Sequence, residues 1–471
     1  MIRKKQKGVI IVLVIIFEGI FLILLGGLSG LIILQLRQSL EKAAWTRSLQ
    51  VAEAGVNFYR WCLNHEIDCP VENDFFDPEG NKIGRFFLGV SSISSCDQTM
   101  GHEVVSTGWT DDFPDIQRKV KALYGRISVS QYAYLLNDNV WAGADREIRG
   151  LYHSNGGIRM DGENQSLVTS SRDSWLCTLS FGCFSWDCPQ GCVADGDACS
   201  CPGVFTTTDN SNPDLFDFPV PSFDFEGITI ELAQIKELTS SYPQEKYWPP
   251  STDIDANAKG YHLKFFEDGT FEVWLITELE ATYAYSLEEG WHDDYFTIKN
   301  EYLYGQFSID PGCSLLYFED NLWVEGKVKG KVTVVSADLL NPTKDTTVVL
   351  PSNIEYTLQD GSDGLAMVGQ KDVLISPDSP NNMELRGIFI AQKGRFGRNL
   401  YLFNIKDKLE IHGSIISKGR VGTKWSSGSI VISGYLEREN YIDSNLIYFP
   451  PPFVPHISPD FEIVNWEEVE E

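Results

Sequence analysis

The chain has 471 residues, 43% of them hydrophobic, and a formal net charge of −28 at pH 7. This charge repels nucleic acid and anionic lipid, so we expect no nucleic-acid partner. The length and the hydrophobic content predict two to four domains with a large core.

The first predicted element is an apolar segment at Val9–Leu34, in which Glu18 is the only charge. A helix of this length spans a hydrocarbon layer of about 30 Å. Cations cluster just before it, which predicts a single-pass membrane segment with its N-terminus in the cytoplasm and the bulk of the chain outside. They are Arg3, Lys4, Lys5 and Lys7.

The apolar segment continues into a polar helical pattern. No proline occurs before Pro70, so one helix is expected over residues 9–61. A secretory signal peptide would have a shorter apolar core that ends in a small-residue cleavage site, whereas this core is too long and runs directly into an amphipathic helix.

KKQKG at residues 4–8 and QVAEAGVNFYRW at 50–61 resemble two features of one family. The first looks like a class III prepilin leader, and the second is similar to the AEAG segment of PilX-type minor pilins. The resemblance implies a leader over residues 1–8, cleavage after Gly8 by a prepilin peptidase, and a methylated mature N-terminus at Val9. It also implies partnership with other pilin-like subunits through the helix.

Four residues of the apolar segment are candidates for assembly. Many major pilins carry glutamate at the fifth mature position, which is Leu13 here, whereas Glu18 is at the tenth. Glu18 either contacts a partner helix and sets the register between the two, or has no such role and is protonated or lies at the membrane interface. Gly26, Gly27 and Gly30 permit close helix packing or local unwinding, or they reflect ordinary tolerance of glycine in membrane helices.

A small antiparallel headgroup is expected over residues 62–130. Cys62 and Cys69 are close enough in sequence to staple the end of the helix. Strand-like runs with turn residues between them follow at 82–93, 101–110 and 115–129. A long helix packed on such a sheet is the layout of the pilin family.

Residues 131–455 are expected to form a repetitive β domain. Gly387 and Gly413 mark two copies of one pattern, 26 residues apart in the sequence, and this spacing suits one coil of a solenoid. A right-handed parallel β-helix is the first choice and a β-sandwich the alternative. Residues 134–143 are expected to open the stack and 448–455 to close it. The pattern occurs at 148–162, 385–397 and 411–422.

The acidic segment 456–471 is expected to be a solvated or loosely packed tail.

All ten cysteines follow the apolar segment, and an even number in an exported chain predicts a disulfide framework whose pairing the sequence leaves open. Six of them lie in an insertion at 172–202, without a CxxC motif or a nearby histidine. A disulfide-knotted loop is therefore preferred over a zinc site. The cysteines are Cys62, Cys69, Cys96, Cys177, Cys183, Cys188, Cys192, Cys199, Cys201 and Cys313.

A second insertion, 240–300, contains a predicted hairpin at 259–277 with Asp268-Gly269 in its turn. Asp253, Asp255 and Asn257 just before it match the start of a calcium loop and are weak calcium candidates. Lys264 occupies the position where an EF-hand needs glutamate, which excludes that motif. No cofactor is expected.

The predicted function is a minor or tip subunit of a type IV pilus-like filament or secretion machine, presenting its β domain for assembly or surface attachment. One alternative is a permanently anchored surface adhesin outside any filament. The third is a β-helix polysaccharide lyase or hydrolase. Enzymatic activity is not expected, because His153, the best nucleophile partner, aligns with Ile390 and Ile415 at an ordinary repeat position.

Overall fold

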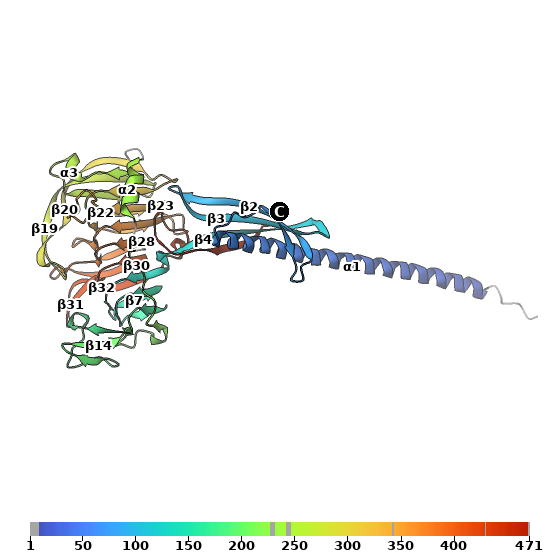
Figure 1. Cartoon of the computed structure of the whole chain (residues 1–471), viewed down its shortest axis with the longest axis horizontal. Coiled ribbons are helices and arrows are strands. Elements are labelled where there is room, and N and C mark those ends of the chain that lie inside the picture. Colours follow the sequence, from blue (N-terminus) through green and yellow to red (C-terminus); the bar gives the residue numbers. More distant parts are fainter. Residues whose placement is uncertain (1–8, 227–230, 242–245, 342, 429, 470–471) are drawn as a thin grey trace, which may run out of the picture. The chain divides into compact units, whose positions relative to one another are not determined.

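The computed structural model describes residues 9–226, 231–241, 246–341, 343–428 and 430–469 (Figure 1). The chain divides into two compact units. The helix unit contains Met1–Ser92, Gly101–Tyr124 and Phe461–Glu471, and the β unit contains Ile93–Met100 and Gly125–Asp460. In sequence, the β unit is therefore inserted within the helix unit, and each unit is described by itself below.

The helix unit begins with α1, which runs without a break from Val9 to Asn64. The helix expected over residues 9–61 is thus confirmed, with a slightly later end. Its buried residues all lie in the second half, at the three- and four-residue spacing of a single helix face. They are Ala44, Ser48, Val51, Ala52, Gly55, Val56, Tyr59 and Cys62.

A sheet of five strands accompanies α1 in the helix unit, in the order β1-β2-β3-β4-β33. The three expected strands correspond to β2, β3 and β4, whereas β1, antiparallel to β2, was not expected. The strands are β1 (Glu72–Phe76), β2 (Lys82–Ser95), β3 (Gln98–Thr110), β4 (Phe113–Ser128) and β33 (His456–Val469).

The expectation of a loosely packed acidic tail at 456–471 is wrong, because the described part of this segment forms β33 beside β4. Phe461 and Ile463 alternate with polar residues and pack against the core of the helix unit. The side chain of Asn64 accepts a hydrogen bond from the Phe461 amide at 2.8 Å, and Arg60 Nε donates to the Phe461 carbonyl at 3.1 Å. Two acidic residues of β33 pair with cations of β4: Glu468 forms an ion pair with Arg118, and Glu467 lies 4.0 Å from Lys121.

Two glycines allow α1 to pack closely on the sheet. A Cβ added to Gly108 on β3 would lie 2.3 Å from the Ala52 nitrogen of the helix backbone. A Cβ on Gly55 would lie 2.2 Å from Ser106 Oγ. Backbone atoms cannot rotate away as a flexible side chain can, so the Gly108 position requires glycine.

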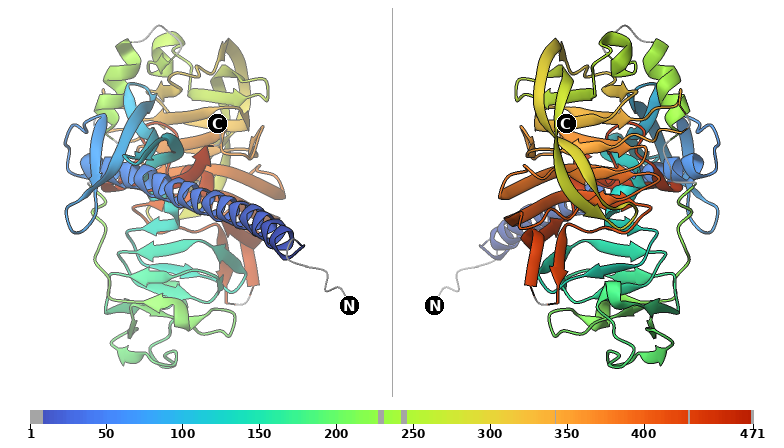
Figure 2. Two further views of the ribbon diagram at one scale, coloured as in Figure 1. Left: turned by 90° about the vertical axis from the view of Figure 1, so that its right-hand side faces the viewer. Right: turned by 90° about the vertical axis from the view of Figure 1, so that its left-hand side faces the viewer.

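The β unit contains, within its described residues, a sheet of 22 strands and two sheets of three strands. Figure 2 shows these strands stacked one above another. The strands of the large sheet are β5 (Tyr132–Leu136), β7 (Arg146–Arg149), β8 (Leu151–Ser154), β10 (Glu163–Asn164), β11 (Val168–Ser170), β16 (Phe216–Asp217), β17 (Tyr247–Trp248), β18 (Gly260–Phe265), β19 (Thr270–Ser286), β20 (Gly290–Ser308), β21 (Leu315–Phe318), β22 (Leu322–Val328), β23 (Lys331–Ser336), β24 (Val348–Leu350), β25 (Ile354–Tyr356), β26 (Gly364–Gly369), β27 (Val373–Ile375), β28 (Asn382–Ala391), β29 (Phe396–Gly397), β30 (Ile405–Ser417), β31 (Lys424–Ser427) and β32 (Ile430–Tyr441).

The smaller elements of the β unit connect and cover this stack. One small sheet contains β6 (Val140–Ala142), β9 (Ile158–Met160) and β15 (Val204–Phe205), and the other contains β12 (Ser174–Cys177), β13 (Val193–Asp195) and β14 (Ala198–Pro202). The helices are α2 (Leu232–Ser241), α3 (Ser251–Ile254) and the short 3-10 turns η1 (Val129–Gln131), η2 (Leu179–Phe181), η3 (Pro213–Leu215) and η4 (Ser444–Leu446).

The glycine repeat expected from the sequence appears in the register of the large sheet. Gly387 on β28 pairs directly with Gly413 on the parallel strand β30. Gly150, from the third copy of the pattern, shares their backbone conformation, with φ of 145° against 149° and 137°. His153 lies in one row with Leu135, Ile416 and Ile390, so its alignment with Ile390 is confirmed and the alignment with Ile415 is displaced by one residue.

The order of the strands differs from the expectation for residues 134–143, which were placed at the opening of the stack. Parallel pairing places β5 between β30 and β8, in the interior of the ladder. The ladder reads β17-β21-β23-β26-β28-β30-β5-β8-β11-β16. The chain thus enters the ladder in the middle, at β5, and builds outward to one end, at β16. It then continues at the opposite end, at β17, and builds back to the middle, at β30. A repeat pattern identifies equivalent strands but not which copies become neighbours.

Residues 448–455, expected to close the end of the stack, instead cover one of its faces. Phe453 and Val454 pack in a cluster with Val335, Ile388 and other residues of the ladder. Lys331 donates a hydrogen bond to the Phe449 carbonyl at 2.6 Å. The prolines prevent this segment from pairing as a strand, so it supplies apolar side chains rather than a final rung.

The expected hairpin in the second insertion is confirmed. Strands β18 and β19 pair antiparallel around Asp268-Gly269, with Phe265 opposite Phe271. A second, longer hairpin joins β19 to β20. It runs along the outside of the stack (yellow in the right-hand view of Figure 2), and its Tyr285 backbone pairs with Leu400.

We predict that Gly108→Ala lowers the free energy of unfolding of the helix unit by roughly 1–3 kcal/mol, because the new methyl group overlaps the α1 backbone. Gly89→Ala, also on the sheet, is the control, since its Cβ would lie 3.8 Å from the Val105 carbonyl. Urea unfolding of the full chain in detergent measures both. Equal stability of the two variants would contradict the close approach.

Candidate functional site

The most distinctive functional surface is the N-terminal half of α1. Large apolar side chains from Val9 to Leu34 are exposed to at least 43% of their area. A soluble helix would bury one face of such a segment. By length and composition this is a candidate membrane span, and the only one found in the described residues. Val9 is 66% exposed, and Gly8, the predicted cleavage residue, lies outside the described residues.

The four assembly candidates lie on this exposed half. Glu18 is exposed on the helix surface, where no described residue buries it. A Cβ added at Gly26, Gly27 or Gly30 would meet nothing within 4 Å beyond the neighbouring residues and the helix's own backbone, and α1 continues through them without unwinding. Their predicted roles toward a partner helix remain predictions.

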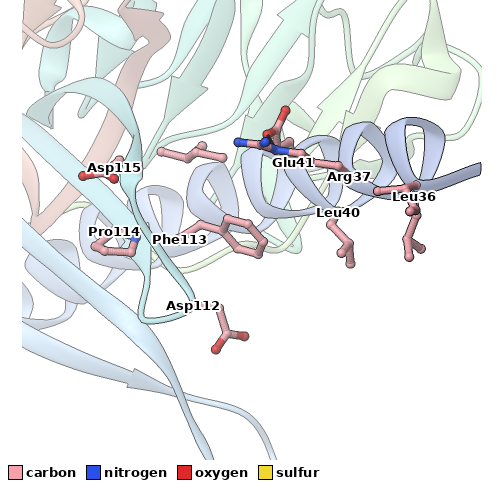
Figure 3. Close-up of a pocket in the computed structure, with 10 residues that line it drawn as sticks. Leu36, Arg37, Leu40, Glu41, Asp112, Phe113, Pro114 and Asp115 are labelled. Carbon is pink, nitrogen blue, oxygen red and sulfur yellow. Dashed lines mark hydrogen bonds and ion pairs between the residues drawn. The ribbon is translucent and has the colours of Figure 1, made fainter. Parts of the chain in front are cut away.

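A groove lies at the point where α1 leaves the sheet (Figure 3). It has a volume of about 440 Å³. Apolar side chains from the helix face apolar side chains from the beginning of β4, with an Arg37–Glu41 ion pair of 3.0 Å at the edge of the groove. The lining residues are Ile33, Leu36, Arg37, Leu40, Glu41, Asp112, Phe113, Pro114, Asp115 and Ile116.

Polar contacts fix the docked half of the helix beside this groove. Ser48 donates to the Ile116 carbonyl at 2.8 Å, and Tyr124 donates to the Val56 carbonyl at 2.7 Å. Burial raises the pKa of Tyr124 well above its usual range. Arg118 stacks 3.2 Å from the centre of the Trp45 ring and forms an ion pair with Glu468. The helix is therefore held firmly from Trp45 onward, and the segment before it is left for other contacts.

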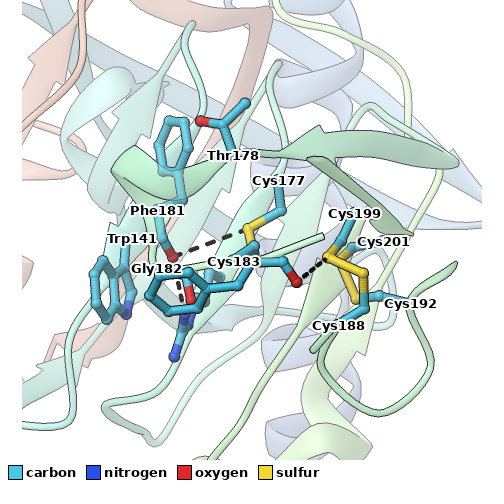
Figure 4. The surroundings of a disulfide bond; sticks show 12 residues. Trp141, Cys177, Thr178, Phe181, Gly182, Cys183, Cys188, Cys192, Cys199 and Cys201 are labelled. Atoms are coloured by element: carbon cyan, nitrogen blue, oxygen red, sulfur yellow. Dashed lines mark hydrogen bonds between the residues drawn. A yellow bond between two sulfur atoms is a disulfide. The ribbon is translucent and has the colours of Figure 1, made fainter. Parts of the chain in front are cut away.

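The cysteines are all consumed in five disulfides, as the even number predicted. Cys62–Cys69 staples the end of α1, and Cys96–Cys313 lies within the β unit. The insertion at 172–202 is knotted by Cys177–Cys183, Cys188–Cys199 and Cys192–Cys201 (Figure 4).

The sulfur atoms of Cys177, Cys183 and Cys201 lie close enough together to suggest a metal site. Each belongs to a disulfide, which removes the thiolate that a metal would need. The insertion is thus knotted by disulfides, as expected.

The weak calcium candidates do not form a common oxygen cage. Asp253 lies in α3, and Asp255 follows directly after this helix. One oxygen of Asp255 accepts a hydrogen bond from the Asn257 amide at 2.9 Å, and the other accepts from Tyr302 at 3.3 Å. These contacts are those of a capping turn, and we assign no cation to it.

His153, the nucleophile partner considered for an enzyme, is buried. Its Nδ1 lies 2.8 Å from the Thr169 hydroxyl, and its Nε2 lies 3.1 Å from the Asn155 side chain. Burial lowers its pKa, which favours the neutral ring. The ring forms T-shaped contacts with Tyr132 and Phe223. These interactions give His153 a packing role.

A second histidine, which the sequence did not single out, lies between two carboxylates. His262 on β18 is 4% exposed. Its Nδ1 lies 2.8 Å from Glu301, and its Nε2 lies 3.3 Å from Glu325. Burial alone would lower the pKa of His262, but the two carboxylates outweigh this effect and raise it. Strand pairing creates this cluster, so no sequence spacing could have revealed it.

These features together define a class: a long helix with an exposed apolar half, docked on a small sheet that carries an inserted, disulfide-bonded β unit. No family model matches the chain, and no curated protein matches it. Among solved structures, it is similar to the competence-associated pilin ComZ from Thermus thermophilus. The identity is 13% and the TM-score 0.27, with 90% of this chain and 97% of that chain covered. Because both values are low, we base the functional proposal on this chain's own geometry.

We predict that the His262 cluster makes the stability of the β unit depend on pH. Because the folded pKa of His262 is raised above its ordinary value of 6.5, its contribution is fully present below that pH. It is lost as the pH rises through the folded pKa. His262→Gln should cost roughly 1–3 kcal/mol at pH 6 and less at pH 9.

Urea unfolding at both pH values measures this difference, with the exposed residue His65 changed to Gln as the control. A loss from His262→Gln that is the same at both pH values would show that the ring acts through packing alone.

Proposed function

We propose that this chain is a minor or tip subunit of a type IV pilus-like filament or secretion machine. The division of α1 is the observation that carries the proposal. Its first half exposes an apolar surface suited to a membrane and to the helices of other subunits. Its second half is fixed to an antiparallel sheet. One helix can then serve first as an anchor and later as the axis of assembly.

The β unit is the part presented outside the cytoplasm. Five disulfides fit an oxidising compartment. We further propose that its parallel ladders are the faces of a right-handed β-helix. Strand β28 pairs with both β26 and β25, and β30 pairs with both β5 and β32. Each of these long strands therefore takes part in two ladders. Its role is assembly or surface attachment rather than catalysis, and it needs no cofactor.

The proposed partners follow from the same helix. A prepilin peptidase cleaves between Gly8 and Val9, and methylation of the Val9 amine follows. Other pilin-like subunits then contact Glu18 and the glycines, and one of their apolar helices fills the groove around Leu40. The chain begins as a single-pass protein of the cytoplasmic membrane and reaches the surface on assembly.

Processing is tested by the mass of the N-terminus. We expect the protein purified from its native membrane to begin at Val9 with one added methyl group. Gly8→Val should leave the leader attached, while the neighbouring change Lys7→Gln should not. An intact Met1 in the wild-type protein would overturn the pilin proposal and leave the anchored adhesin.

Assembly is tested at the groove. Leu40→Gln keeps the helix but removes an apolar contact worth about 1.5–3 kcal/mol when fully buried. We expect incorporation into sheared filaments to fall by about tenfold or more, while the amount in the membrane is unchanged. Lys42→Gln, which is exposed and outside the groove, should incorporate normally. Absence of the wild-type chain from filaments would favour a permanent anchor.

A further inference from the structure

Two arginines lie at paired positions inside the β unit, on β32 and β7, which are neighbouring strands (Figure 1). Parallel pairing places Arg438 directly opposite Arg146. Their exposed fractions are 6% and 3%. Like charges at neighbouring rungs repel, and burial removes the water that would screen them. Such an arrangement requires compensation by negative charge.

The described side chains supply only part of this compensation. Asp145 accepts two hydrogen bonds from Arg438, at 2.8 and 2.9 Å, and lies 3.2 Å from Lys424. Outward-facing Glu147 and Glu439 are engaged elsewhere, with Arg149 and Lys408. Three cations in this group therefore share one carboxylate.

Arg146 itself is bound to neutral groups. Its Nη1 donates to the Tyr134 hydroxyl at 2.9 Å, and that hydroxyl donates to the Asn440 side-chain oxygen at 2.5 Å. The Tyr152 ring packs 4.8 Å from the Tyr134 ring. Arg146, Asn440 and Tyr152 are thus gathered around one phenol.

Each of these three residues retains a hydrogen-bond donor with no partner among the described residues: Arg146 Nε, Asn440 Nδ2 and the Tyr152 hydroxyl. All three side chains are at least 97% buried. A buried donor without an acceptor costs about 1–3 kcal/mol. Three donors beside an excess of positive charge call for an acceptor that is itself negative.

We propose that Arg146, Asn440 and Tyr152 bind a single small halide ion, chloride under physiological conditions. A halide accepts several hydrogen bonds from any direction, whereas a water molecule would leave the charge unbalanced. The surrounding residues belong to a closely packed core, which favours a monatomic anion over a phosphate or a carboxylate. Burial, and after it the neighbouring Arg146, lower the pKa of Arg438 to about 10.

The proposed ion lies where the first and last strands of the β unit meet. Here β5 and β7, from the beginning of the β unit, join β30 and β32 from its end. Bound chloride would fasten this junction, since Asn440 belongs to one side and Arg146 and Tyr152 belong to the other. The inference is independent of the proposed role in a filament.

Crystals of the full chain grown in sodium bromide test the site directly. We expect an anomalous peak at hydrogen-bond distance from Arg146 Nε and Asn440 Nδ2. In solution, the melting temperature should be roughly 2–4 °C higher in chloride than in gluconate at equal ionic strength. Arg146→Met should abolish this difference, whereas Arg149→Met, on the exposed face of β7, should retain it.

If Arg146→Met fails to fold, Tyr152→Phe removes one donor while keeping the packed ring, and it should weaken the chloride effect. A water molecule in place of bromide would overturn the proposal. So would a bromide peak without any difference between chloride and gluconate, which would mean binding at crystal concentration only.

Discussion

One uninterrupted helix has to satisfy two environments, and the rest of the structure depends on this constraint. From Ala44 to Cys62, α1 buries a face against its own sheet, where glycines on both sides allow close contact. From Val9 to Leu34 its large apolar side chains are at least 43% exposed, and among the described residues the groove at Ile33 is where the sheet approaches it. A stable fold tolerates such an apolar surface only when lipid or other helices cover it. The exposed half is therefore the surface on which the proposed function rests.

In sequence, most of the β unit is inserted between two strands of the helix unit's sheet, β4 and β33. The chain leaves the small sheet after β4 and returns as β33, which bonds to Asn64 and Arg60 through Phe461. Both ends of the inserted unit are thus tied to strands of one sheet. Within the β unit, η1 and residues 446–455 lie side by side, since Ser128 and Ser130 both bond to the Leu446 carbonyl. The acidic Glu468 of the last strand pairs with Arg118 of β4, so part of its acidity balances cations of the sheet.

The order of strands in the β unit brings together the buried polar residues around Arg146 and Arg438. Because the first strands of the unit join its last ones, each junction ladder brings together residues about 300 positions apart, such as Arg438 and Asp145. Ladders of apolar residues alone would pair in several registers with similar energy. A buried polar group that is satisfied in only one register can select among them, as a polar residue does in a coiled coil.

The sequence by itself determined the features that rest on local chemistry. Apolar length predicted the exposed half of α1, the lack of proline predicted its continuity, and repeated glycines predicted the pairing of Gly387 with Gly413. It also predicted the hairpin at Asp268-Gly269 and the disulfide framework. Only the tertiary structure decided the place of β5 in the ladder, the pairing of β33 with β4, and the gathering of Arg146 with Arg438 or His262 with Glu301. These contacts join distant segments, and their stability comes from packing and burial that no local pattern encodes.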